Sequence, residues 1–290
     1  MIGAACDRRD EGPDGHSKMR CVPRGAKQRA EPTERPDMVH TETRGSVTWL
    51  RMESGKVQAI DDNLVGDLSA AIERAAAAGS PPLVLTGTGT SFSAGIDLFR
   101  LVEEPQEYTK RSLPAFAALL RALFTYPGPL VAAVNGHAIA GGAILAWCGD
   151  LCVMASGKGR IGVPELKVGL PFPAAAVEVL RFALGGRRLQ SLVYLGATLS
   201  PDEALTAGLV DEVVPPELLG EHAVSLAARL GAMPAESFRL TKQALRRPFV
   251  EALERHGQAA DEQVLAAWLA PGALEAVRAY LNRTFNRGTP

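Results

Sequence analysis

The chain has few cysteines, almost no net charge and no long apolar run, and each absence excludes a class of protein. Four cysteines in 290 residues, none in a CxxC pair, make neither a disulfide scaffold nor a zinc site. The net charge of −1 gives no sign of a nucleic-acid or acidic-membrane partner. No uninterrupted apolar run reaches the ~20 residues that a membrane helix needs. We therefore expect a soluble, cytoplasmic protein without a metal site, a nucleic-acid partner or a membrane partner.

Several catalytic and nucleotide-binding motifs are absent as well. No G-x-S-x-G elbow of a serine hydrolase is present, although Ser91 and Ser93 follow a strand-like segment. Gly87-Thr88-Gly89 is only a fragment of a dinucleotide fingerprint, because Phe92 stands where the third glycine is needed. No P-loop occurs. The sequence thus argues against these three classes of enzyme.

Residues 1–45 differ in composition from the rest of the chain. They are charged, punctuated by proline and glycine, and show no apolar periodicity. Such a segment buries too little apolar surface to offset the entropy lost on ordering, so we expect a disordered leader. Met38 is a plausible alternative start, and the sequence leaves open whether residues 1–37 belong to the natural protein.

Strand-like and helix-like segments alternate from Val47 to Ala155, which predicts parallel strands joined by helices, an α/β fold. After Glu165 the pattern becomes mainly helical, and Ser200-Pro201-Asp202-Glu203 has the form of a capping box. The expected strands are 47–52, 56–60, 83–86, 130–134, 151–155 and 210–214. The expected helices are 63–78, 107–124, 142–148, 216–230, 235–245, 249–269 and 272–284.

Two glycine turns are the most informative features. The strand-like Leu130–Val134 leads to Gly141-Gly142, which start an apolar helix, and a similar strand-turn-helix element contains Ser91–Leu98. Glycine lets backbone N–H groups approach a ligand closely, and the start of a helix favours negative charge. Two such elements can hold one oxygen between them. The alternative is that the glycines only permit close packing of helix and strand.

These two segments, with Pro164-Glu165 and the stretch 195–210, resemble the enoyl-CoA hydratase/isomerase (crotonase) family from about Val47 onward. The resemblance implies a crotonase-like spiral of ββα units over residues 46–199 and a helical trimerisation region over 200–290. It also implies an acyl-CoA thioester substrate from fatty-acid metabolism, a homotrimer or homohexamer, and no cofactor, since coenzyme A is part of the substrate.

The resemblance also assigns roles to residues. The backbone N–H groups of Ile96 and Gly141 would stabilise the oxygen of a thioester enolate, and losing one such donor typically costs 10²–10³ in rate. Glu165 would transfer the proton, since burial would raise its pKa toward the working range. The alternative is a structural carboxylate that caps a helix. Asp150 stands where the family has a structural acid. Other substrate or coenzyme A contacts implied are Lys56, Ala59, Ala94, Asp97, Leu98, Gly142, Ile144, Pro164 and Leu170.

Position 144 departs from the family's hydratases, which carry a glutamate there to hold and activate water. Ile144 can neither orient water nor pass a proton, so the pattern resembles the Δ3-Δ2-enoyl-CoA isomerases, which use one carboxylate. Leu170-Pro171-Phe172-Pro173 replaces a glycine-rich stretch and predicts a bulkier pocket wall. We therefore favour double-bond isomerisation. A hydratase with a rewired water site and a non-catalytic acyl-CoA-binding homologue remain the alternatives.

Overall fold

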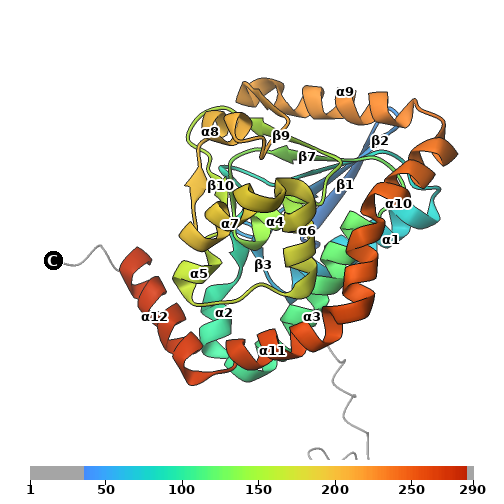
Figure 1. Ribbon diagram of the computed structural model, residues 1–290. Coiled ribbons are helices and arrows are strands. Elements are labelled where there is room, and N and C mark those ends of the chain that lie inside the picture. Colours follow the sequence, from blue (N-terminus) through green and yellow to red (C-terminus); the bar gives the residue numbers. More distant parts are fainter. Residues whose placement is uncertain (1–35, 286–290) are drawn as a thin grey trace, which may run out of the picture. The chain divides into compact units, whose positions relative to one another are not determined.

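Six strands form the main sheet of the computed structural model, which describes residues 36–285. Their order is β1-β2-β4-β7-β9-β12, and neighbours pair in parallel except β1 with β2. Every residue of β4 and β7 is buried, as expected for central strands covered on both faces. The bounds are β1 Val39–Arg44, β2 Val47–Met52, β4 Leu83–Thr86, β7 Leu130–Val134, β9 Leu151–Ala155 and β12 Glu212–Val214 (Figure 1).

Strand β1 corrects the predicted leader. Residues 39–44 were included in the disordered segment, yet they pair along their whole length with β2. Only Val39 of β1 is buried, and Gly45 makes the connecting turn with φ +64°. An edge strand of this kind is ordered by main-chain hydrogen bonds to its neighbour, which amino-acid composition does not report. Residues 1–35 of the predicted leader lie outside the described residues.

The predicted spiral is visible in the order of the short strands. Each of β2, β7 and β9 is followed by one short strand and then a helix, a ββα unit, and β4 is followed by two short strands and then a helix. The strands β5, β8 and β10 are parallel neighbours in a second sheet, which β11 completes, and β3 pairs with β6. Successive strand-to-helix turns therefore stack beside one another. The bounds are β3 Ala59–Ile60, β5 Ser91–Ser93, β6 Gly95–Ile96, β8 His137–Ile139, β10 Ile161–Gly162 and β11 Thr198–Leu199.

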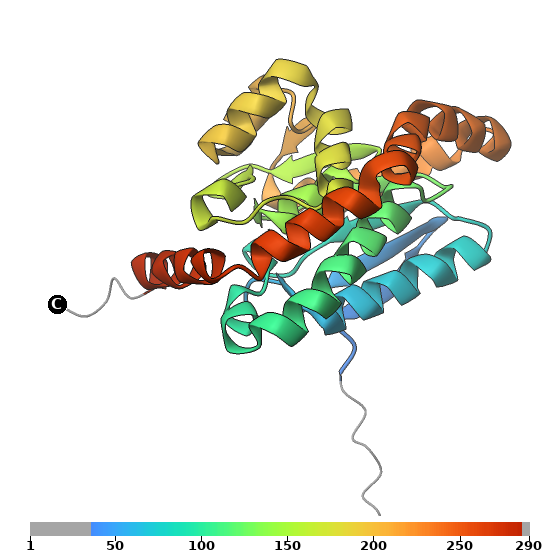
Figure 2. The same cartoon turned by 60° about the horizontal axis from the view of Figure 1, so that its bottom comes forward.

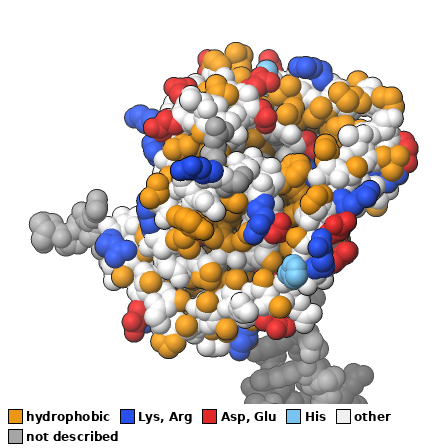
Figure 3. All heavy atoms as spheres, in the orientation of Figure 1, with side chains coloured by type: hydrophobic (Ala, Val, Ile, Leu, Met, Phe, Trp, Pro, Cys, Tyr) orange, Lys and Arg blue, Asp and Glu red, His pale blue; other side chains and the backbone are white. Residues whose placement is uncertain are grey.

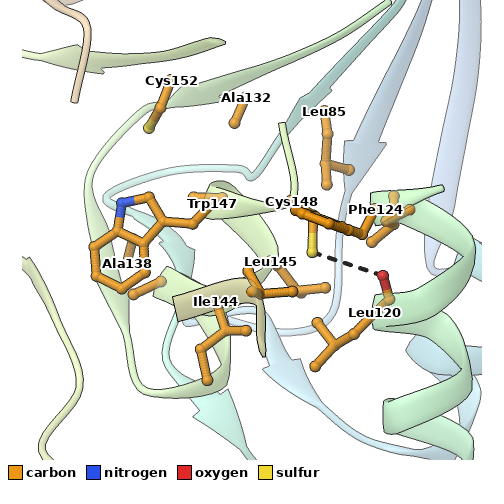
Figure 4. Packing of buried hydrophobic residues seen from close by; sticks show 14 of the residues in the cluster. Leu85, Leu120, Phe124, Ala132, Ala138, Ile144, Leu145, Trp147, Cys148 and Cys152 are labelled. Atoms are coloured by element: carbon orange, nitrogen blue, oxygen red, sulfur yellow. Dashed lines mark hydrogen bonds between the residues drawn. The ribbon is translucent and has the colours of Figure 1, made fainter. Parts of the chain in front are cut away.

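Different helices cover the two faces of the main sheet. On one face, Val84 and its neighbours Val131 and Val153 pack against α9. On the other face, Leu85 belongs to a larger core shared with α1, α3, α4 and α6. This alternation follows from the two-residue period of a strand. In Figure 4, Cys148 at the end of α4 points toward Leu120 of α3, whose carbonyl oxygen lies 3.8 Å from Cys148 Sγ. The bounds are α1 Asp62–Ala77, α2 Leu98–Glu103, α3 Pro105–Phe124, α4 Gly141–Trp147, α5 Glu165–Val168, α6 Ala174–Leu184 and α7 Gly186–Leu195.

The region after residue 200 is mainly helical, as predicted, but one expected break is missing. The expected break between 245 and 249 does not occur, because α10 runs through Pro248 and joins α11 by a π-helical turn, Leu253–Gly257. Arg246 and Phe249 are buried on either side of that proline, so packing outweighs its cost. Earlier in the chain, the expected strand 56–60 is shortened to β3, because a turn occupies the residues before Ala59. The remaining bounds are α8 Pro201–Thr206, η1 Pro216–Leu218, α9 Leu219–Gly231, α10 Ala235–Ala252, α11 Gln258–Trp268 and α12 Pro271–Phe285.

A buried ionic cluster anchors α10 to the core. Asp150 accepts hydrogen bonds from Lys242 at 2.7 Å and from Arg246 at 2.8 Å. Arg246 also donates to the carbonyls of Phe124 and Cys148, at the carboxyl ends of α3 and α4, where the helix dipoles favour a cation. Burial lowers the pKa of Lys242 to about 8. Asp150 therefore has the structural role that the resemblance implied, since two buried cations depend on it.

Within residues 36–285, no single helix is long and apolar enough to cross a membrane. One pair, Ala235–Trp268 with Pro271–Thr284, meets the criteria of length and composition only when taken together across a 64° bend.

Candidate active site

The two glycine turns meet. Gly95 in β6 has φ +86°, and a Cβ atom there would lie 2.9 Å from the Cβ of Ala140 and 3.0 Å from the nitrogen of Gly141. Only glycine fits a backbone with this φ at such an approach. Ala140 itself has φ 55° and ψ −129°, an unfavourable conformation for a residue with a side chain. Backbone strain is thus concentrated where the turns touch.

Both candidate donor N–H groups lie at this contact. The N–H of Asp97 donates to the carbonyl of Ile60 in β3 at 3.1 Å. Because N–H groups alternate in direction along a strand, the N–H of the preceding residue, Ile96, points away from β3. No strand of the described chain pairs with that other side of β6. Gly141 is the first residue of α4, where an N–H has no acceptor within the helix. Two backbone donors are therefore available to one ligand atom.

Gly142 has a different role from the predicted ligand contact. A Cβ atom at this position would lie 2.2 Å from the carbonyl oxygen of Ser93 and 2.8 Å from its Cβ. Gly142 does not line the pocket described below. A side chain does not fit at position 142, because α4 packs directly against the backbone of β5. Of the pair Gly141-Gly142, the explanation of close packing therefore applies to Gly142.

Gly142→Ala is therefore expected to lower stability. Overpacking a tight contact typically costs about 1–3 kcal/mol, a fall of roughly 2–12 °C in melting temperature for a domain of this size. Thermal unfolding measures it. Gly66→Ala is the matched control, because Gly66 is exposed in α1 with nothing within 4 Å of its added Cβ. An unchanged melting temperature for Gly142→Ala would show that the contact relaxes freely.

Glu165 begins α5, just after β10, and its side chain is half-buried. Its Oε2 atom is buried and has no hydrogen-bond partner among the described residues. Burial raises the pKa of Glu165 to about 8. The N-cap of α5 is Pro164, and no side chain caps this helix. The geometry therefore disfavours the alternative that Glu165 is only a helix cap. A buried carboxyl with a raised pKa is typical of an acid–base group.

One pocket is lined both by the turns and by Glu165. It brings together eight of the predicted residues: Ala94, Ile96, Leu98, Gly141, Ile144, Pro164, Glu165 and Leu170. Among its described lining side chains, the polar groups are the carboxyl of Glu165, the hydroxyl of Tyr280 and the indole N–H of Trp268, which donates to the carbonyl of Pro171. Ile144 is 1% exposed and supplies an apolar wall one turn into α4. The pocket is therefore suited to an apolar group held beside one carboxyl.

Three more predicted contacts lie outside this lining. Lys56 is exposed in the turn before β3, and Ala59 pairs with Gly95 across β3 and β6. Asp97 is the N-cap of α2, where its carboxylate accepts from the N–H groups of Phe99 at 2.9 Å and Arg100 at 3.1 Å. The structure thus assigns Asp97 a capping role, and the coenzyme A contacts of Lys56 and Ala59 stay predictions.

Several lining residues were not identified from the sequence, and four of them come from distant helices. Leu113 and Phe116 come from α3, Trp268 from α11 and Tyr280 from α12. No motif marks them, because they reach the pocket only when distant helices fold back over it. The bulky wall predicted at residues 170–173 is present, and all four of its residues line the pocket.

Comparisons with known proteins identify the family. A family model described as enoyl-CoA hydratase/isomerase matches residues 42–284. A Thermus thermophilus protein named as an enoyl-CoA hydratase is 41% identical over 167 residues, 56% of this chain and 65% of that protein. Mouse mitochondrial enoyl-CoA delta isomerase 1 is 35% identical over 170 residues, 58% of each chain. The chain thus spans about two thirds or less of these relatives' lengths.

The fold comparison agrees. The crystal structure of human mitochondrial Δ3-Δ2-enoyl-CoA isomerase superposes with a TM-score of 0.82 at 25% identity, covering 87% of this chain and all of that one. The predicted crotonase-like spiral is therefore confirmed, and this chain belongs to the enoyl-CoA hydratase/isomerase family.

Proposed function

We propose that the protein moves the double bond of a 3-enoyl-CoA thioester to the 2-position. The observation that carries the proposal is the carboxyl of Glu165, whose buried Oε2 has no partner among the described residues, in a pocket that Ile96, Gly141 and Ile144 also line. Ile144 stands where a hydratase of this family has its second acid. The names of related proteins include both hydratases and isomerases, so the choice between them rests on the site itself.

The proposed reaction is a proton transfer through an enolate. Ionised Glu165 takes a proton from C2 of the substrate, and the electron pair of that C–H bond moves toward the thioester carbonyl. The N–H groups of Ile96 and Gly141 stabilise the resulting negative oxygen. Protonated Glu165 then returns the proton to C4, which leaves the double bond between C2 and C3. A pKa of about 8 suits a group that both accepts and donates a proton near neutral pH.

The pocket wall supports isomerisation over hydration. Adding water requires polar groups that hold a water molecule next to the double bond, and a water site typically needs two to four polar partners. Around Glu165 the lining side chains Ile144, Leu170 and Phe172 offer none. The hydratase alternative would require Tyr280 or another group to take the second role.

The partners implied by the family remain part of this proposal. Proton transfer of this kind needs no group beyond Glu165 and the donors, so we propose coenzyme A as part of the substrate and no separate cofactor. We also propose a homotrimer or homohexamer in the cytoplasm. Hydrophobic side chains are exposed among charged ones on the face shown in Figure 3. The exposed apolar residues of the described chain include Tyr194 and Leu195 of α7, which are 70% and 67% exposed.

Ile144→Glu is expected to raise hydration of 2-enoyl-CoA relative to isomerisation of 3-enoyl-CoA. The new carboxyl would supply the missing acid, although its gain is limited because an apolar surrounding favours the protonated form. Turnover of both substrates by wild type, Ile144→Glu and the control Ile144→Leu measures it. The proposal would yield to the hydratase if the natural protein hydrated 2-enoyl-CoA rapidly and the substitution gave no gain. No turnover of either substrate by wild type would favour the non-catalytic homologue.

A further inference from the structure

The wall above Glu165 cannot be held by an ordinary strand ladder. Residues 170–173 are Leu-Pro-Phe-Pro, and neither proline has an N–H to donate. This segment nevertheless lines the pocket over Glu165 with all four residues. The N-cap of the following helix, α6, is Pro173, which cannot accept the free N–H groups of that helix through a side chain.

Two side chains of α11 supply the missing hydrogen bonds. Asp261 Oδ1 accepts from the N–H of Ala174, the first residue of α6, at 2.7 Å. Asp261 thus caps a helix that begins 87 residues earlier, and its negative charge lies at the positive end of that helix. Trp268 Nε1–H donates to the carbonyl oxygen of Pro171 at 2.8 Å, while the ring, 6% exposed, lines the pocket. The two bonds hold both ends of the wall.

The C-terminal helices have the rigidity that this role needs. Helix α11 continues from α10, which the buried Asp150 cluster fixes to the core. Figure 2 shows the orange-red helix of α10 and α11 crossing over α3, the green helix. Val277 and Leu281 of α12 belong to the same apolar cluster as Val168 of α5 and Leu170 of the wall.

We propose that Asp261 and Trp268 are positioning residues that hold the segment 170–173 closed over Glu165 and keep water away from its carboxyl. This inference deepens the proposed function and rests on it for its effect on turnover. Its structural part, the exclusion of water from Glu165, does not.

The titration of Glu165 reports on that exclusion. Desolvation is the cause that raises its pKa, and no neighbouring charge contributes. Glu165 is the one charged residue that lines the pocket among the described side chains of α5, α7, α11 and α12. Tyr280 is the other titratable residue of the lining. The charged neighbours that lie outside the lining are Lys167, Arg187, Asp261, Glu262, Glu275, Arg278 and Arg283. Opening the wall should therefore act on Glu165 through water rather than through a change of charge.

The test uses Trp268→Phe, which removes the N–H but keeps an aromatic ring, and Asp261→Ala, which removes the acceptor. Asp261→Asn retains an acceptor oxygen and should behave nearly as wild type. Glu262→Ala is the control for a change on the same helix, because Glu262 is exposed and bonds only to Gln258 of α11 among the described residues. Direct titration of Glu165 by ¹³C NMR in the full-length chain gives its pKa. The pH profile of kcat with 3-enoyl-CoA gives the pKa of the same group during turnover.

We expect the pKa of Glu165 to fall by about one unit or more in Trp268→Phe and Asp261→Ala, toward the value of an exposed carboxyl. The acidic limb of kcat should move to lower pH with it, and kcat should drop more than KM changes. If Asp261→Ala does not fold, Trp268→Phe decides alone. Unchanged titration in the folded variants, or a wild-type Glu165 that already titrates like an exposed carboxyl, would overturn the inference. Shifted titration with no turnover even in wild type would instead refute the proposed function and leave the positioning role standing.

Discussion

Glu165→Gln is expected to lower turnover of 3-enoyl-CoA by about 10²–10⁴-fold, the usual contribution of a general acid–base group. Glutamine has nearly the same shape but neither accepts nor returns the proton. Binding of a saturated acyl-CoA should remain, because the donors Ile96 and Gly141 and the apolar lining are unchanged. Steady-state turnover and calorimetric binding measure the two effects. Near-normal turnover would remove Glu165 from the mechanism.

The same variant should change how stability depends on pH. The pKa of Glu165 is raised from 4.5 to about 8 in the folded protein. Between these values the unfolded chain has lost the proton that the folded protein still holds, so this group makes stability fall as pH rises from about 4.5 to about 8. The total is on the order of a few kcal/mol. Glutamine does not titrate, so Glu165→Gln should lack this fall and unfold at a higher denaturant concentration than wild type above pH 8.

Gly141→Pro is expected to reduce turnover by about 10²–10³-fold, the cost of losing one oxyanion donor. Proline removes the N–H, and the first position of a helix is where proline is best tolerated. Gly141→Ala keeps the N–H. Its added Cβ would lie 3.1 Å from Phe116 Cζ and 3.2 Å from Ile60 Cδ1, two side-chain ends that can move, so a smaller loss is expected.

The proline variant needs a check of folding, because proline restricts the residue before it and Ala140 already has φ 55°. Circular dichroism and thermal unfolding must match those of Gly141→Ala before the turnover numbers are compared. A folded proline variant as active as Gly141→Ala would contradict the donor assignment of Gly141.

Much of the spiral could be predicted because its signals are local. The strands β2, β4, β7 and β9 have the bounds expected from short apolar runs, and α1 lies within one residue of its expected ends. Capping residues such as Asp61 and Ser200 mark helix starts by hydrogen bonds within three residues. Where order depends on a partner far along the chain, the prediction was wrong or missing. Strand β1 is ordered by β2, and α10 passes Pro248 because its flanks are buried.

The candidate site divides in the same way. The sequence by itself determined the residue types: a glycine at each turn, one glutamate after Pro164, an isoleucine at 144 and two prolines in the wall, since these follow from motif and spacing. Only the tertiary structure decided their environments. Gly142 is needed for a contact with Ser93, Asp97 caps a helix, and the buried Oε2 of Glu165 lies in a pocket that Leu170, Trp268 and Tyr280 line from three separate segments. Burial and desolvation are properties of groups brought together across the chain, and so the pKa that the proposed chemistry needs is set by packing rather than by any local pattern.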